Sequence, residues 1–72
     1  MVTAAQLRAG RSLLNWTVRD LAKRAGVHRN TITRAETGGT GYGPAVAKVV
    51  ETLEAAGVEF TGRAGVRLRK GR

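Results

Sequence analysis

Cysteine is absent from the sequence, and histidine occurs once, as His28. The absence of cysteine excludes disulfides and thiolate chemistry. One histidine is too few for a zinc site built from the usual Cys and His ligands. We therefore expect the chain to hold no metal and no cofactor.

Acidic side chains are also scarce, because five Asp and Glu residues stand against thirteen Lys and Arg residues. The acidic residues are scattered among basic ones, and none forms an evident catalytic pair with His28 or with a nucleophile. We predict that the chain is not an enzyme. The formal net charge of +8 indicates a polyanionic partner, and nucleic acid is the commonest one that presents phosphates in rows.

Long hydrophobic runs are missing as well. The sequence has no apolar stretch long enough to cross a membrane, no signal-peptide pattern and no lipidation motif. We therefore expect a cytoplasmic protein. With 72 residues, of which 42% are hydrophobic, the chain makes one domain with a thin core that a second chain could thicken.

The spacing of apolar residues predicts two helices in the first third of the chain. The first runs over residues 3–14, where Ala4, Leu7 and Leu14 recur at helical spacing. The second runs over residues 18–25. Thr17 and Asp20 have the spacing of a capping box at its start, and Trp16 precedes that cap as one half of a hydrophobic staple.

Two more helices follow. The third covers residues 29–37, with His28 at its cap and with Ile32 and Ala35 pointing inward. A loop with four glycines, residues 37–43, separates it from the fourth helix. The fourth helix begins at Pro44 and ends at Gly57, because Pro suits the first position of a helix and valines then recur at helical spacing.

Alternation of apolar and charged residues near the end of the chain predicts a β-hairpin. Its apolar side, which we expect to pack on the helices or on a second chain, consists of Val58, Phe60, Val66 and Leu68. We therefore predict a mainly α fold, with four helices of the helix-turn-helix type and a short C-terminal hairpin or strand. Residues 1–57 would form the DNA-binding domain, and residues 58–72 a basic hairpin and tail.

The second and third helices form the motif that carries function. Gly26 stands where a helix needs a left-handed stop, so the chain turns sharply between two short helices. Such a helix-turn-helix lays its first helix across the DNA backbone and offers the second to the major groove.

Residues 21–38, LAKRAGVHRNTITRAETG, resemble the core of the phage repressor and Cro-like, or Xre-type, regulators. The resemblance extends from about Gln6 to Val58. It implies that bases are read from the start of the third helix by Arg29 and Asn30, and one turn later by Arg34. Arg can donate two hydrogen bonds to guanine, and Asn can pair with adenine. Thr33 could contact a thymine methyl group.

Phosphate contacts would position the protein without specifying sequence. The residues that we expect to make them are Thr17, Arg19, Lys23, His28, Thr31, Thr40 and Tyr42. The resemblance also implies a structural ion pair between Arg11 and Glu36. Val18 departs from the family pattern, which often has Gln there, and His28 departs from the usual Ser or Thr. The basic residues of the tail, Arg63, Arg67, Arg69, Lys70 and Arg72, would be either a solvated end or an additional phosphate-binding arm.

These features together predict a sequence-specific transcriptional regulator, a repressor or autoregulatory controller of a bacterial cell. It would bind double-stranded DNA as a homodimer on an inverted repeat with half-sites about one helical turn apart. Two alternatives remain at the level of sequence. One is an antitoxin or anti-regulator that binds a protein through the same scaffold, and the other is sequence-neutral binding of nucleic acid or RNA.

Overall fold

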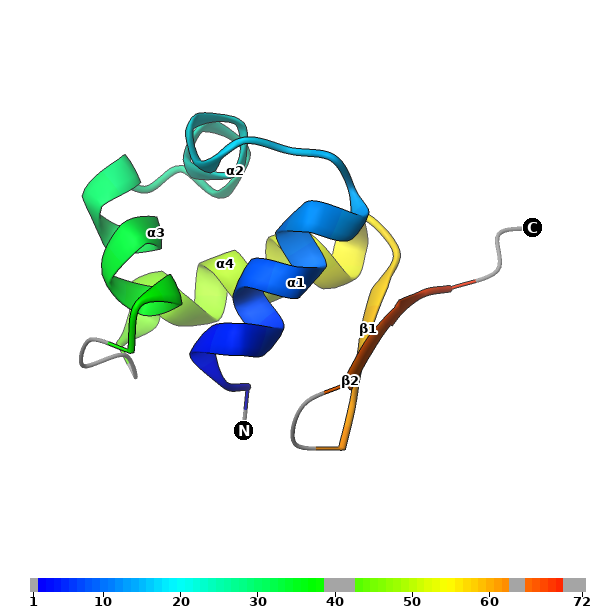
Figure 1. Cartoon of the computed structure of the whole chain (residues 1–72). Helices are drawn as coiled ribbons and strands as arrows, with labels where there is room; N and C mark the ends of the chain where they lie inside the picture. Colours follow the sequence, from blue (N-terminus) through cyan, green and yellow to red (C-terminus); the bar gives the residue numbers. More distant parts are fainter. Residues whose placement is uncertain (1, 39–42, 63–64, 70–72) are drawn as a thin grey trace.

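The computed structural model describes residues 2–38, 43–62 and 65–69. Figure 1 shows α2 and α3 at one end, a hairpin at the other, and α1 with α4 between them. In the described part of the chain the predicted fold class is confirmed, because four helices precede one two-stranded antiparallel sheet. The elements are α1 (Ala4–Leu13), α2 (Val18–Ala25), α3 (Arg29–Glu36), α4 (Pro44–Ala55), β1 (Val58–Thr61) and β2 (Gly65–Leu68).

The core lies where the four helices meet the hairpin. Its largest fully buried apolar side chains are Leu21 from α2, Ile32 from α3, Val49 and Leu53 from α4, and Val58 from β1. Gly10 of α1 permits a close approach between this helix and the hairpin. A Cβ atom at this position would lie 3.2 Å from Cγ1 of Val58, so a larger residue would push the hairpin away.

The hairpin packs one side on the helices, as its alternation predicts. Val58 pairs with Leu68 and Phe60 with Val66, so the four apolar residues share a face of the sheet. Val58 is buried in the core, whereas Leu68 at the outer end of the hairpin is 44% exposed. The hairpin is therefore part of the same packed unit as the helices.

Gln6 connects the start of α1 to the hairpin. Its Oε1 accepts a hydrogen bond from the backbone N–H of Thr3 (2.9 Å), which completes a capping box. Its Nε2 donates to the carbonyl oxygens of Gly62 and Gly65, at 3.2 and 3.0 Å. Gln6 is buried, and every polar atom of its side chain has a partner, so the polar group is accommodated in the core.

Two arginines of α1 hold the end of α3. The Arg11 guanidinium donates to both oxygens of the Glu36 carboxylate, from Nε at 2.7 Å and from Nη2 at 2.9 Å. Arg8 donates to the Glu36 main-chain carbonyl at 2.5 Å, and so satisfies a group that the helix end leaves open. The hydrogen bond to Glu36 raises the pKa of Arg11. These contacts fix α3 relative to α1.

The capping box of α2 has the geometry that its sequence predicts. The Thr17 hydroxyl accepts from the Asp20 N–H at 3.0 Å, and the Asp20 carboxylate accepts from the Thr17 N–H at 2.9 Å. The hydrogen bonds from Thr17, first of all the backbone one, lower the pKa of Asp20. The start of α2 is thus stabilised by an ionised carboxylate.

Replacing Glu36 by Gln should lower the free energy of unfolding by about 2 kcal/mol or more, because it leaves the largely buried Arg11 charge without a counter-ion. Urea unfolding measures the change. Glu59→Gln is the matched control, since it breaks the exposed pair with Arg67 and should cost less than about 1 kcal/mol. Equal losses of unfolding free energy in the two variants would show that the Arg11–Glu36 pair stabilises the protein no more than the exposed Arg67–Glu59 pair does.

Replacing Asp20 by Asn should destabilise the protein more at neutral than at acidic pH. The hydrogen bonds from Thr17 hold the pKa of Asp20 below its ordinary value in the folded state, so its contribution is present above about pH 4 and is lost as the pH falls through the lowered value. Thermal unfolding of both proteins between about pH 2.5 and pH 6 tests this. A difference in Tm that does not change with pH would contradict it.

Candidate nucleic-acid interface

The turn between α2 and α3 is closed by backbone hydrogen bonds. Gly26 adopts φ 71°, the left-handed conformation that glycine takes at little cost, and the N–H of Val27 donates to the Ala22 carbonyl at 3.0 Å. His28 then caps α3, because its Nδ1 accepts from the Asn30 N–H at 3.0 Å. The two short helices are therefore held at a defined angle by groups within the motif itself.

The cap sets the tautomer of His28. A neutral imidazole whose Nδ1 accepts a hydrogen bond carries its proton on Nε2. The exposed ring can thus donate one hydrogen bond from the start of α3 to a group outside the protein. A histidine in place of the usual Ser or Thr performs the capping and keeps a donor available.

One side of α3 is buried and the other faces solvent. Ile32 and Ala35 are buried in the core, as is Glu36 with its arginine partners. The predicted base readers all lie on the exposed side, which consists of Arg29, Asn30, Thr33 and Arg34. The third helix therefore presents a polar and basic surface over its first two turns.

The side chains on this surface differ in what they can still bind. The Thr33 hydroxyl donates to the Arg29 carbonyl at 3.2 Å, so its methyl group and lone pairs remain for an outside partner. Within the described residues, the side chains of Arg29, Asn30 and Arg34 donate no hydrogen bond to the protein. Exposed donors without an internal partner are available to a ligand.

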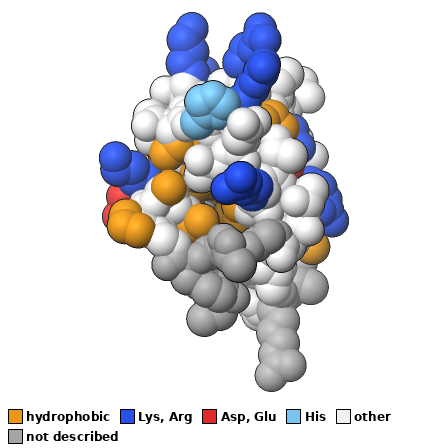
Figure 2. All heavy atoms as spheres, turned by 90° about the vertical axis from the view of Figure 1, so that its left-hand side faces the viewer, with side chains coloured by type: hydrophobic (Ala, Val, Ile, Leu, Met, Phe, Trp, Pro, Cys, Tyr) orange, Lys and Arg blue, Asp and Glu red, His pale blue; other side chains and the backbone are white. Residues whose placement is uncertain are grey.

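Figure 2 shows the end of the molecule that carries α3, with Lys and Arg side chains standing around the single histidine and acidic side chains only at the margins. Arg19 and Lys23 of α2 are exposed and follow each other at i and i+4, so they share one side of that helix. Thr17 is engaged in the α2 cap, and Thr31 is half-buried. Thr40 and Tyr42 lie outside the described residues.

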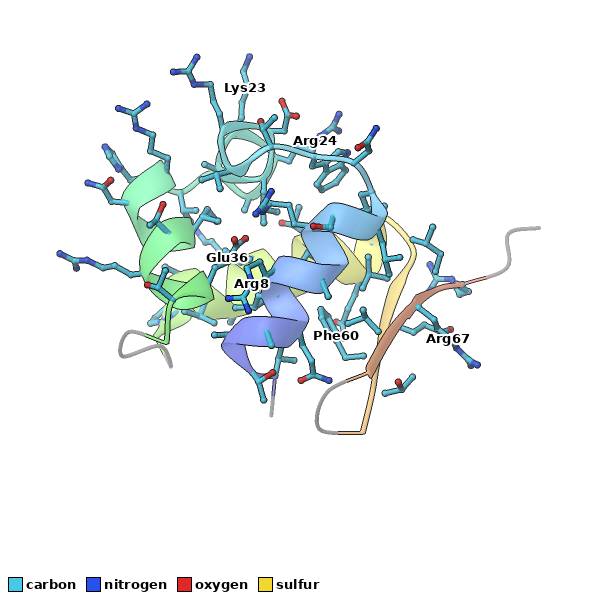
Figure 3. All side chains as sticks on the ribbon, viewed as in Figure 1. Arg8, Lys23, Arg24, Glu36, Phe60 and Arg67 are labelled. Carbon is cyan, nitrogen blue, oxygen red and sulfur yellow. The ribbon has the colours of Figure 1, made fainter. Side chains whose placement is uncertain are left out.

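Arg24 is a basic residue of α2 whose position was not predicted. Its guanidinium carbon lies 4.5 Å from the centre of the Trp16 ring, a cation–π contact that orients the side chain toward the start of α2 and away from α3. In Figure 3, Lys23 points away from the protein body while Arg24 turns to the other side of α2. A tryptophan and an arginine eight positions apart are a weak sequence signal, because only the fold brings them together.

A shallow hollow of about 160 Å³ lies between α3 and the start of α4. Its lining includes Thr31 and Arg34 from α3 and Ala45 and Val46 from α4, with Gly43 at the helix cap. No side chain caps α4. Pro44 has no N–H and Val46 donates its own to the Gly43 carbonyl at 3.0 Å, so Ala45 supplies the N–H of the first turn that lies close to the basic surface of α3.

Other kinds of site find no support in the described residues. Residues 2–38, 43–62 and 65–69 contain no group of three or more His, Asp or Glu side chains that could hold a metal ion. None of the helices in these segments has the length and apolar character that a membrane crossing requires.

Comparison with known proteins agrees with the geometry of α2 and α3. A search of curated proteins found no match to the chain. The family model described as a helix-turn-helix domain matches residues 3–64, which include all four helices and β1. The chain therefore belongs to the helix-turn-helix domain family, a family of DNA-binding modules.

Proposed function

We propose that this protein is a sequence-specific transcriptional regulator of the Xre or Cro-like type, which binds an inverted-repeat operator as a homodimer. The observation that carries the proposal is the exposed side of α3, where Arg29, Asn30 and Arg34 keep their donors available on a helix that is capped and anchored. A wide major groove admits one such helix.

The three side chains suit base readout. Arg29 and Arg34 would each donate two hydrogen bonds to O6 and N7 of a guanine, and Asn30 would donate to and accept from an adenine. Thr33, whose hydroxyl bonds back to the helix, would turn its methyl group toward a thymine. Each good contact discriminates between bases by about 1 to 3 kcal/mol.

Phosphates would be held on both sides of α3. Arg19 and Lys23 would contact one strand from α2, together with Thr17, Thr31 and the Nε2–H of His28. Support for a contact on the other side comes from the start of α4 beside Arg34, where the helix dipole and the Ala45 N–H favour a phosphate. By sequence, Thr40 and Tyr42 precede this helix start and would add to the same contact.

The homodimer and the regulatory role follow from the small size of the reading surface. A single helix of eight residues makes too few base contacts to select one operator, and a two-fold dimer doubles them on an inverted repeat. Occupation of such an operator would repress the neighbouring promoter, which could be the promoter of the protein's own gene. The protein would act in the bacterial cytoplasm and would be associated with the nucleoid when bound.

Substitution of the base readers should weaken binding and relax specificity at one operator position each. Selection of bound duplexes from a random pool gives the operator, and fluorescence anisotropy with single-base variants of it gives the discrimination. We expect Asn30→Ala and Arg34→Ala each to lose about 1 to 3 kcal/mol on the selected operator and to lose discrimination at one base pair. Binding that is unaffected by both changes would favour the protein-binding alternative, and enrichment of no motif would favour sequence-neutral binding.

The phosphate contacts predict a second, separate effect. Arg19→Gln and Lys23→Gln should each reduce the slope of log K against log salt by about 1 without altering the preferred sequence. Arg69→Gln removes the same charge from the hairpin, which lies at the opposite end from α3, and should leave the slope unchanged. If Arg69→Gln also flattens the slope, the basic tail takes part in binding as an additional arm.

A further inference from the structure

The two ends of α3 are held by different kinds of contact. Arg8 and Arg11 hold the last turn through Glu36, and guanidinium groups are not deprotonated in proteins. The first turn is held by the neutral imidazole of His28, whose Nδ1 accepts the hydrogen bond from the Asn30 N–H at 3.0 Å. That N–H has no other acceptor among the described residues. The start of α3 therefore depends on one side chain that can gain a proton.

Protonation removes the acceptor at His28. An imidazolium carries a proton on each ring nitrogen, so neither nitrogen can accept a hydrogen bond. Rotation of the ring does not restore the cap, because it only exchanges one N–H for the other. A cation at this position also meets the positive end of the helix dipole, which disfavours it. The neutral form of His28 therefore holds Asn30, and the charged form cannot.

The charged groups next to His28 are basic. They belong to the last turn of α2 and to the first residue of α3, and they are Lys23, Arg24 and Arg29. In Figure 2, Lys and Arg side chains stand around the imidazole on this face of the molecule. In the described residues His28 takes part in no ion pair. No protein carboxylate therefore compensates for the cap when His28 is charged.

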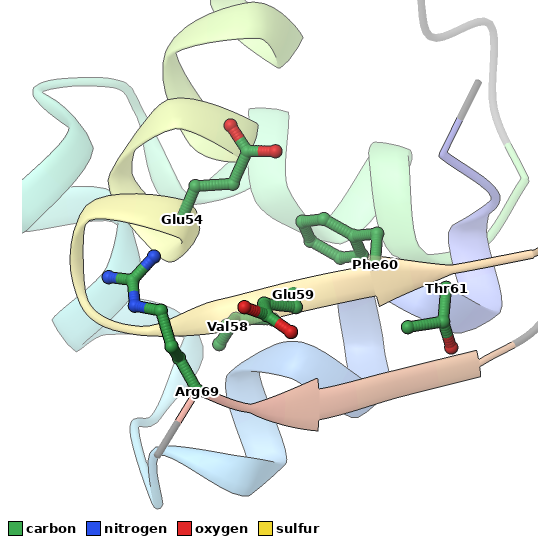
Figure 4. Close-up of a pocket in the computed structure, with 6 residues that line it drawn as sticks. All are labelled: Glu54, Val58, Glu59, Phe60, Thr61 and Arg69. Carbon is green, nitrogen blue, oxygen red and sulfur yellow. The ribbon is translucent and has the colours of Figure 1, made fainter. Parts of the chain in front are cut away.

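The carboxylates of the chain lie elsewhere. Asp20 binds Thr17 at the far end of α2, and Glu36 is engaged with Arg11 at the far end of α3. The remaining three belong to the second half of α4 and to β1, and they are Glu51, Glu54 and Glu59. Figure 4 shows the last two beside a hollow along β1, at the hairpin end of the molecule and opposite to α2 and α3.

We propose that His28 is a positioning residue for Asn30 that acts only in its neutral form, so that acidification releases the start of α3 and removes base reading by Asn30. The inference rests on the base readout proposed above and names a proton as its regulator. Arg34 lies one turn further along the helix, toward the end that α1 anchors, and it keeps its base contact. His28 gains a positive charge as it loses the cap, so attraction to DNA phosphates persists. Acidification thus lowers sequence preference and leaves general DNA affinity in place.

The composition of the chain makes this proton measurable. His28 is the single histidine and cysteine is absent, so His28 is the one side chain whose charge is expected to change between about pH 5.5 and pH 8. An α-amino group titrates in the same range, but it is common to all variants and cancels when they are compared. Substitutions at position 28 therefore isolate the proton.

Thermal unfolding of the full chain at about pH 8 and about pH 5.5 tests the cap without DNA. His28→Asn is the matched control, because its side-chain oxygen caps a helix at either pH, and His28→Ala has no cap at either pH. Wild type should have a Tm near that of the Asn variant at the higher pH. At the lower pH it should fall by about 4 to 8 °C relative to the Asn variant, to the level of the Ala variant or below. A Tm difference between wild type and the Asn variant that is the same at both pH values overturns the proposal.

Fluorescence anisotropy on the selected operator tests the reading. A charge on His28 affects all duplexes alike, so we compare the dissociation constants for the operator and for single-base variants of it. The preference at the base pair read by Asn30 should fall about three- to tenfold on acidification in wild type and stay constant in His28→Asn. The preference at the base pair read by Arg34 should stay constant in both proteins.

The outcomes of the binding experiment are distinct. An unchanged preference at the Asn30 base pair overturns the proposal, and so does an equal fall at the Arg34 base pair, because the whole helix would then have loosened. If selection yields no operator at either pH, the proposed base readout fails. The Tm comparison still decides in that case whether His28 holds the start of α3 only when it is neutral.

Discussion

A carboxylate at the end of α3, the second helix of the helix-turn-helix, is the constraint around which this small domain is arranged. Glu36 ends α3, and its charge would repel phosphate if no cation neutralised it. Arg11 neutralises the carboxylate inside the protein, and Arg8 binds the carbonyl of the same residue. A group that would oppose DNA binding thereby becomes the anchor of α3, and α1 becomes the element to which α3 is fixed.

The helix α1 also contacts the hairpin, at the other end of the molecule. Gln6 binds the carbonyls on either side of the hairpin turn, and Gly10 lets β1 approach. One side of α1 therefore holds the end of α3 through arginines, and another side holds the hairpin through an amide and close packing. A domain with few apolar residues to bury depends on such charge-assisted and polar contacts to fix its structure. In the described residues, every buried side-chain nitrogen and oxygen has a hydrogen-bond partner.

Features set by neighbouring residues could be predicted from sequence. The Thr17 and Asp20 box, the left-handed Gly26 and a C-terminal hairpin with its apolar residues on one side follow from local spacing and alternation, and the structure confirms them. The inward position of Gln6, the Arg8 contact and the stacking of Arg24 on Trp16 could not be predicted. Each joins segments distant in sequence, and a polar residue on an apolar face carries no signal of the partner that will satisfy it. For the interface, the helical period predicts which side chains of α3 are exposed, but not which bases they would meet.

The central claim is that α3 enters the major groove and reads base edges there. Methylation interference on the selected operator tests it directly, because dimethyl sulfate modifies guanine at N7 in the major groove and adenine at N3 in the minor groove. We expect methylation of guanine N7 within each half-site to block binding, and methylation of adenine N3 within the same half-sites to leave binding intact. Interference confined to adenine N3, or none at either atom, would contradict it.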